Sequence, residues 1–430
     1  MHTVAKKCRP LLQTRLGRCV AAFALALPAW VSAQPAAATS ADANRALAVR
    51  FLESIQRQTY LSLGREPPVY GKEFMDRFIE RYLNSPGAAS ETPEGRDRLV
   101  ARIRQIAESG QRSRYEDPFG YSIVESLDRQ IKDVLDAGAI KLDSIPVFGT
   151  LPTLRVNART FAVPGSDLVV IAFEDQMFEF ALLFTKAAAY TLPGKRGADG
   201  GAQFSTAKDD IRKRIETDPE PLKRFQEVLM AYIFGGRPGL APQYFQGEPH
   251  ASAANALRES MELFILGHEY GHFIAHHLRE GRQIKAAIGS EEVTEIVRSW
   301  ADEFEADAYG LQLSVAAMRR AKVDLALSYW GCDFFFTTLD IIDRALRLVA
   351  TGEETDPDLA DATRRSHPPA PWRRDQLRKA VKAFEGGAAS EPLALAESLQ
   401  FAMELMWEKT RPLFVQAHEA GRRAHPSWQQ

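Results

Sequence analysis

The segment His268-Glu269-Tyr270-Gly271-His272 limits how this chain can fold more than any other, because it lies in a run whose apolar residues recur at helical spacing. Residues four apart on a helix share one face, so the two imidazoles can hold one metal ion. The carboxylate of Glu269 can then reach a water on that ion without binding the ion itself. Zinc lowers the pKa of such a water to about 7, where a glutamate can take its proton. The segment therefore predicts a zinc-binding helix with His268 and His272 as ligands and Glu269 as catalytic base.

The same pattern has a second interpretation, a helix with two hydrogen-bonded histidines and no metal. Two more histidines, His276 and His277, lie one turn further along and favour it. His276 continues the face of His268 and His272, but it is too far along the helix axis to reach the same ion easily. We expect neither His276 nor His277 to be a ligand.

A second helical segment, residues 300–307, supplies candidate acidic ligands. Glu303 and Asp307 are four apart and share a face. A catalytic zinc ion has three protein ligands and one open position, which Glu303 would complete. Asp307 could then accept a hydrogen bond from the free ring nitrogen of a ligand histidine. The alternatives are Glu305 as the ligand and an acidic helix face that is simply solvated.

Composition and periodicity predict a mainly helical protein with a small β-sheet, an α+β fold. The chain has 430 residues, of which 45% are hydrophobic and 26% charged, as in ordinary globular proteins. Short β-like runs at 154–163, a Pro164-Gly165 turn and a buried strand at 168–173 form the one clear β region. Helical patterns cover most of the rest, at residues 44–84, 95–109, 120–137, 176–190, 219–234, 253–350, 371–384 and 391–419.

The first 33 residues resemble a secretory signal peptide. An apolar run from Cys19 to Val31 ends in Val31-Ser32-Ala33, a typical cleavage site, and the run is shorter than the roughly 20 residues that span a bilayer. Five basic residues and no acidic residue precede the run, namely Lys6, Lys7, Arg9, Arg15 and Arg18. We therefore expect cleavage after Ala33, export to the periplasm and no stable membrane insertion afterwards. The alternative is an uncleaved N-terminal membrane anchor.

Loss of this segment would change both charge and cysteine content. The whole chain carries −2, so removal of five positive charges leaves about −7, which does not favour nucleic acid or anionic lipid as a partner. Cys332 would be the one cysteine left, so no internal disulfide is possible. Export without disulfides fits a bacterial periplasm.

Four motifs in the same order resemble the HtpX-like and CAAX prenyl protease metallopeptidases of the gluzincin group, over roughly residues 154–380. The first two are H-E-x-x-H with a further histidine at His276, and E-x-x-A-D, here from Glu303 to Asp307. The other two are Val156-Asn157-Ala158 with Phe161 and a Pro-Gly turn, and Ser366-His367-Pro368-Pro369 with Arg373.

This resemblance implies roles that the residues alone leave open. It selects Glu303 over Glu305 as the ligand. It also makes His367 a donor to the oxyanion of the tetrahedral intermediate, and places Arg373 beside an acid of the site. Taken without the resemblance, His367 is equally a turn residue before two prolines, and Arg373 a helix cap.

The chain also departs from the family. The stretch before His268 is longer, owing to residues 191–255, and the spacing from His272 to Glu303 is shorter. No segment after the leader is apolar enough to cross a membrane, so we expect a soluble, exported branch of the family. The resulting division is a signal peptide (1–33), a helical N-terminal region (34–145), a zincin-like metallopeptidase domain (146–390) with an insertion at 191–255, and a C-terminal helix and tail (391–430).

These features predict a zinc-dependent metalloendopeptidase that hydrolyses extended or misfolded protein substrates through a zinc-bound water. The glycine-rich insertion at 191–255 would be either a lid or a surface excursion without a role. Two other functions stay open. One is a zinc-stabilised periplasmic chaperone or assembly factor without turnover, and the other is a zincin that cleaves a non-protein amide, such as one in cell-wall material.

Overall fold

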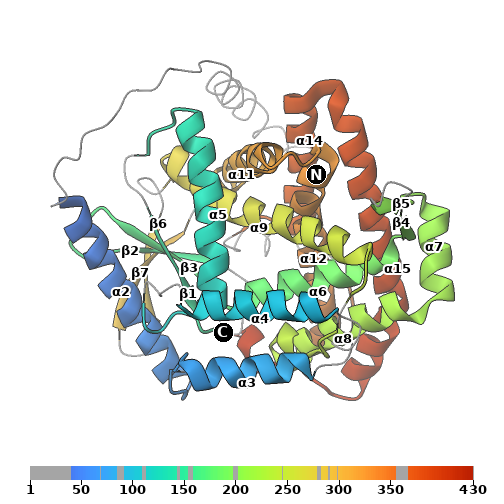
Figure 1. The fold of residues 1–430 in the computed structure, drawn as a ribbon, viewed down its shortest axis with the longest axis horizontal. Helices are drawn as coiled ribbons and strands as arrows, with labels where there is room; N and C mark the ends of the chain where they lie inside the picture. Colours follow the sequence, from blue (N-terminus) through green and yellow to red (C-terminus); the bar gives the residue numbers. More distant parts are fainter. Residues whose placement is uncertain are drawn as a thin grey trace.

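The computed structural model shows a mainly helical chain with a small mixed sheet (Figure 1). It describes residues 40–67, 69–84, 92–108, 113–142, 146–153, 158–196, 202–244, 246–277, 282–288, 291–297, 299–354 and 367–429. The expected signal peptide at 1–33 lies outside these residues. Within them, no helix has the length and apolar character needed to cross a bilayer.

The helices fall into an N-terminal group and a larger group that follows the first strands. The N-terminal helices are α2 (Ser40–Ser62), α3 (Lys72–Leu83), α4 (Pro93–Glu108) and α5 (Pro118–Ala137). The later helices are α6 (Gln176–Thr191), α7 (Lys208–Thr217), α8 (Pro219–Gly235), α9 (His250–Ile274), α11 (Trp300–Arg320), α12 (Leu325–Thr351), α14 (Ala370–Glu385) and α15 (Ser390–Glu419). The expected mainly helical character is thus confirmed, although the helical pattern at 44–84 is divided into α2 and α3.

Five strands form the main sheet, in the order β1-β3-β2-β7-β6. They are β1 (Val147–Leu151), β2 (Ala158–Ala162), β3 (Val169–Glu174), β6 (Arg282–Ile288) and β7 (Glu291–Val297), while β4 (Gly194–Arg196) and β5 (Ala202–Phe204) form a separate pair. β1 runs parallel to β3, and the other neighbours are antiparallel. The tight turn between β2 and β3 contains Gly165 at φ 73°, a conformation that suits glycine.

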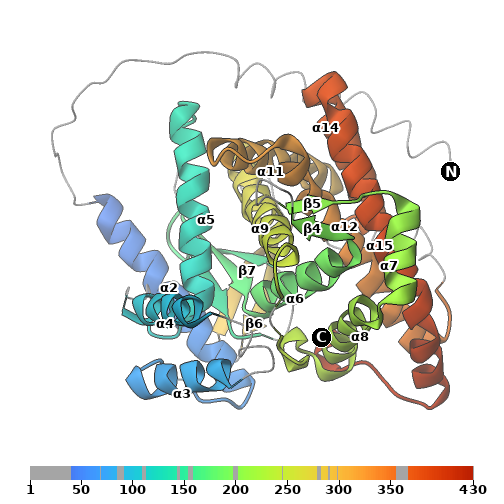
Figure 2. The ribbon, with the colours of Figure 1, turned by 45° about the vertical axis from the view of Figure 1, so that its right-hand side comes forward.

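The sheet is covered on both faces because its side chains alternate. Val170 and Ala172 of β3 pack with α2, whereas Ile171 and Phe173 belong to the main core with α5 and α9. Figures 1 and 2 show α9 crossing the middle of the molecule, with the sheet on one side and α12 and α15 on the other. The sheet thus presents one face to the helix that carries His268.

Residues 282–297 correct one expectation, since they form the β6–β7 hairpin and not part of a long helical stretch. Ile284, Ala286 and Ile288 alternate with other residues, which is the period of a strand. Gly289-Ser290 between the strands is a dipeptide typical of hairpins.

The 191–255 stretch is more ordered than its glycines and prolines indicate. It contains β4, β5, α7 and α8, and α9 begins within it at His250. Phe225, Leu229 and Ile233 of α8 lie fully buried in the main core. This packing gives α8 a structural role, whatever the remainder of the stretch does.

Candidate metal centre

Glycines bring α9 and α11 into backbone contact at the centre of the fold (Figure 2). A Cβ atom on Gly271 would lie 2.8 Å from the carbonyl oxygen of Ala306. On Gly310 it would lie 2.9 Å from the backbone nitrogen of His268. Both distances are shorter than real Cβ contacts, so no larger residue fits without moving a helix. Short side chains on α11 can therefore reach those on α9.

The start of α11 is fixed by a capping box. The Ser299 hydroxyl accepts from the backbone N–H of Asp302 at 3.2 Å, and the Asp302 carboxylate accepts from the N–H of Ser299 at 2.9 Å. This cap places Glu303 in the first turn, facing α9.

His268, His272 and Glu303 converge on one point. The two Nε2 atoms are 3.1 Å apart, and each lies 3.5 Å from a carboxylate oxygen of Glu303. Two ligands about 2.1 Å from a tetrahedral zinc ion are about 3.4 Å apart, so the three atoms fit such an ion. All three side chains are buried, which excludes most competing water. The group could therefore hold a metal ion, and two imidazoles with one carboxylate suit zinc.

Second contacts hold each imidazole with its Nε2 toward this point. Nδ1 of His268 lies 2.9 Å from Oδ1 of Asp307, to which it can donate. Nη2 of Arg373 lies 3.3 Å from the same Nδ1, but it carries donors alone, so the carboxylate decides the tautomer. Nδ1 of His272 lies 3.0 Å from Nδ1 of His277. Nδ1 of His268 donates to the carboxylate, so Nε2 of His268 keeps a lone pair for a metal. Nε2 of His272 keeps its lone pair in the tautomer in which Nδ1 of His272 donates to Nδ1 of His277.

Asp307 and Arg373 form a buried bidentate pair behind His268. The guanidinium donates to the two carboxylate oxygens at 2.8 and 2.6 Å, and it stacks 4.8 Å from the ring centre of Phe336. Burial alone raises the pKa of Asp307, but the Arg373 charge and its hydrogen bonds outweigh burial and lower the pKa to about 2. Because of this low pKa, Asp307 is an anion at any physiological pH. Nη1 of Arg373 also lies 3.6 Å from Glu303.

Carboxyl groups outnumber guanidinium groups around this point. Glu269, Glu303 and Asp307 are buried, and the buried Arg373 contacts Asp307 and Glu303. A group of buried carboxyl oxygens attracts a divalent cation, which agrees with the ligand geometry.

Glu269 and His367 lie beside the ligands and line a cavity of about 540 Å³. Oε2 of Glu269 accepts from the hydroxyl of Thr160 on β2 at 3.4 Å. Nε2 of His367 lies 3.4 Å from Glu303, with 40% of the side chain still exposed. Desolvation by the surrounding protein lowers the pKa of His367, although Glu303 opposes the shift, so the neutral ring is favoured near neutral pH.

The structure shows which of the alternative ligand residues lie at the converging point and which lie elsewhere. Glu303 belongs to the converging group, whereas Glu305 lies 3.4 Å from Nε2 of His277. α9 ends at Ile274, and His276 is exposed at φ 59°. This bend turns the chain back, so that the buried His277 reaches His272. Asn157 and Ser366 of the family motifs lie outside the described residues.

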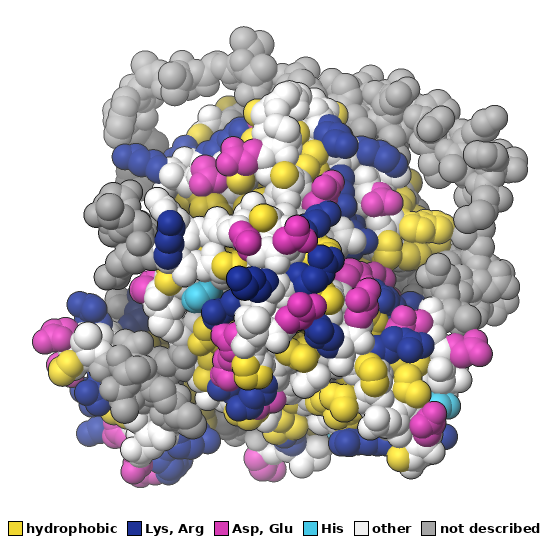
Figure 3. Space-filling view, turned by 90° about the vertical axis from the view of Figure 1, so that its right-hand side faces the viewer, with side chains coloured by type: hydrophobic (Ala, Val, Ile, Leu, Met, Phe, Trp, Pro, Cys, Tyr) yellow, Lys and Arg dark blue, Asp and Glu magenta, His cyan; other side chains and the backbone are white. Residues whose placement is uncertain are grey.

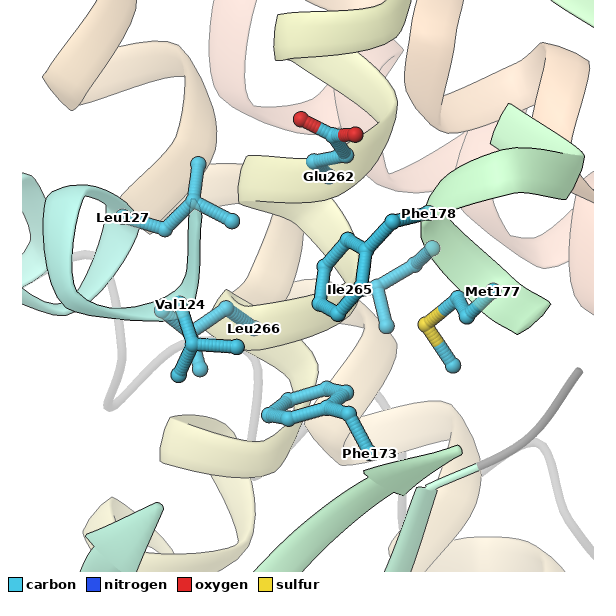
Figure 4. A pocket seen from close by; sticks show the side chains of 8 residues that line it. All are labelled: Val124, Leu127, Phe173, Met177, Phe178, Glu262, Ile265 and Leu266. Atoms are coloured by element: carbon cyan, nitrogen blue, oxygen red, sulfur yellow. The ribbon is translucent and has the colours of Figure 1, made fainter. Parts of the chain in front are cut away.

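A second, much smaller cavity lies on the other side of Met177 and Ile265, which line both. Figure 4 shows its apolar walls and the carboxyl group of Glu262 among them. Burial raises the pKa of Glu262 to about 7, although Arg258 opposes the shift. This small cavity has a volume of about 10 Å³, which holds about one water at most, so the cavity is no substrate site.

No family model matches this chain, and no curated protein or solved structure matches it. The family resemblance of its motifs therefore stays a prediction.

Proposed function

We propose that this protein is an exported zinc metallopeptidase with His268, His272 and Glu303 as the ligands and Glu269 as the catalytic base. The observation that carries the proposal is the convergence of the three ligand atoms beside Glu269, where His268 and Glu269 line a cavity large enough for part of a peptide. A purely structural metal site would be closed by a fourth protein ligand.

Each residue of the site has a task in peptide hydrolysis. Zinc held by His268, His272 and Glu303 would polarise the scissile carbonyl and lower the pKa of the attacking water. Glu269 takes the proton of that water and delivers it to the leaving amine. His367 donates a hydrogen bond to the oxyanion. Asp307 and Arg373 keep His268 in the tautomer and orientation that a ligand needs.

The proposed substrates are extended or misfolded polypeptides. Ala158, at the N-terminal end of β2, lines the cavity, while β2 pairs with β7 nearer its other end, at Phe161. An extended peptide in the cavity would run beside Ala158 and could align through its backbone. Recognition of this kind depends little on sequence and suits unfolded clients.

The test combines metal analysis with cleavage of casein. We expect the protein from residue 34 onward to contain about one zinc per chain and to degrade casein. Glu269→Gln should keep the zinc and lose activity by a factor of at least about 100. Glu262→Gln is the matched control, since it changes a buried glutamate of the same helix outside the metal centre, and it should stay active.

The outcome also separates the other two functions. A fully active Glu269→Gln variant would refute the proposal. Bound zinc without any cleavage, together with biological function that survives Glu269→Gln, would indicate a chaperone or assembly factor. Activity on peptidoglycan fragments but not on casein would indicate a cell-wall amide as the substrate.

A further inference from the structure

The cavity at the metal centre continues along one face of α12. Phe335, Leu339, Asp343, Leu346 and Arg347 of this helix line it, at spacings of three to four residues. At 1.5 Å per residue, this face is about 18 Å long, which matches about five residues of an extended peptide. The cavity is therefore longer than the reacting groups need.

Apolar side chains line the cavity from two helices. Phe335, Leu339 and Leu346 of α12 are each partly exposed, although they pack against the core. Phe264 and Ile265 of α9 line the cavity too, one turn before the ligand His268. Apolar side chains that converge on a cavity and keep some exposure can gain burial from a ligand.

Charged groups line the cavity at two places. Glu269 and Arg373 lie at the metal centre, and Asp343 and Arg347 lie farther along α12, on the two sides of Leu346. Asp343 and Arg347 have opposite signs, so they do not favour ligands of one charge. Beside Phe335 and Leu339 a charged side chain would lose its hydration without gaining a partner, so discrimination comes from these apolar residues.

We infer that this cavity is a specificity site that accepts a large apolar side chain, such as Leu, Met or Phe, next to the scissile bond. The inference rests on the proposed peptidase function and names the substrate class of the same site. It restricts the substrates to segments that folded proteins keep in their cores, because such side chains are exposed mainly in unfolded chains.

The first experiment measures binding without turnover. Fluorescein-labelled Gly/Ser peptides with a single central Leu, Glu or Lys are titrated with the zinc-loaded Glu269→Gln protein, and anisotropy gives Kd. We expect the Leu peptide to bind roughly ten-fold more tightly than the other two, the gain from partial burial of one leucine side chain. Equal Kd values for the three peptides would overturn the inference.

The second experiment changes the wall of the cavity in the Glu269→Gln background. Leu339→Lys should remove the preference for Leu and favour the Glu peptide, and Leu339→Ala should shift the preference from Leu toward Phe. Leu413→Lys is the control, because Leu413 is an exposed leucine on α15 that does not line the cavity. Thermal unfolding establishes that each variant is folded. If Leu339→Lys does not fold, Leu339→Ala still tests the inference.

Failure of the inference and failure of the proposed function give different results. If the wild-type protein cleaves casein at sites without any apolar preference, the specificity site is wrong and the peptidase stands. If the Leu peptide binds preferentially but no substrate is ever cleaved, the apolar binding site stands and the peptidase is wrong. Mass spectrometry of the casein fragments then shows on which side of the scissile bond the apolar residue lies.

Discussion

Replacement of Arg373 by methionine should destabilise the zinc-free protein by about 3–5 kcal/mol. Methionine retains much of the length and the contact with Phe336 but removes the charge that faces Asp307 and Glu303. Removing one partner of a buried ion pair leaves the other charge without compensation, which is the cause of this large cost.

The pKa of Asp307 gives an independent magnitude. Its ordinary value is 3.8 and its value in the folded protein is about 2, so the folded protein favours the anion by about 2 kcal/mol. Because Arg373 must also offset the burial of Asp307, its full contribution is larger than this difference. The stabilisation is present above pH 3.8 and is lost as pH falls toward 2. Arg373→Met should therefore weaken the acid dependence of stability in this range.

Urea unfolding of the EDTA-treated protein near neutral pH, followed by circular dichroism and tryptophan fluorescence, measures the effect. The control is Arg374→Met. Arg374 is adjacent, equally buried and hydrogen-bonded to Thr337 at 3.2 Å, but outside the metal centre, and its loss should cost about 1 kcal/mol. The double variant Arg373→Met with Asp307→Asn should lose less than the sum of the two single losses, since neither charge is left alone. Equal effects of Arg373→Met and Arg374→Met, or strict additivity in the double variant, would refute the reasoning.

Three further outcomes are expected. Glu262 is neutral in the folded state up to about pH 7 but ionises near 4.5 when unfolded, so wild-type stability should fall by about 3 kcal/mol between these values. Glu262→Gln should abolish that fall in urea titrations at several pH values, and an unchanged pH profile would contradict it. Gly310→Ala should force α9 and α11 apart and lower zinc affinity at least ten-fold in a chelator competition, whereas Gly387→Ala, where a Cβ meets nothing within 4 Å, should not. His277→Leu should weaken zinc binding about ten-fold because His272 loses its partner, and a similar loss in the exposed His276→Leu control would argue against that role.

Local periodicity accounts for what could be predicted from the sequence. The spacing of His268 and His272, and that of Glu303 and Asp307, is set within one helix turn, so the side that each pair shares follows from the helix alone. The same holds for the helices that flank the β region. These predictions did not require any knowledge of contacts between distant parts of the chain.

The parts that could not be predicted depend on backbone geometry or on distant pairing. His277 reaches His272 because the chain bends at His276, which no helical period describes. The close crossing of α9 and α11 requires Gly271 and Gly310 together, 39 positions apart in the chain. Glycines at 267 and 271, four apart in a buried helix, were the available signal for such a crossing, but the partner helix is not evident from them.

One face of the surface and the candidate metal centre differ in their charged residues. On the face drawn in Figure 3, basic and acidic side chains are interspersed with apolar ones. At the metal centre, by contrast, carboxylates outnumber the guanidinium that faces them. The composition of this site therefore differs from that of the face in Figure 3, and the total of −2 for the chain conceals the difference.

The backbone contact between α9 and α11 makes the ligand positions independent of chain length elsewhere. Because Gly271 meets Ala306 directly, the separation of the ligands is set by two helix turns and not by the connection between them. The 191–255 stretch is different, because its helix α8 is buried in the main core. The connection between α9 and α11 holds the β6–β7 hairpin, so residues added between β6 and β7 would leave His268, His272 and Glu303 in place. An insertion at that position is therefore a change that this arrangement tolerates during evolution, and it can add new surface at little structural cost.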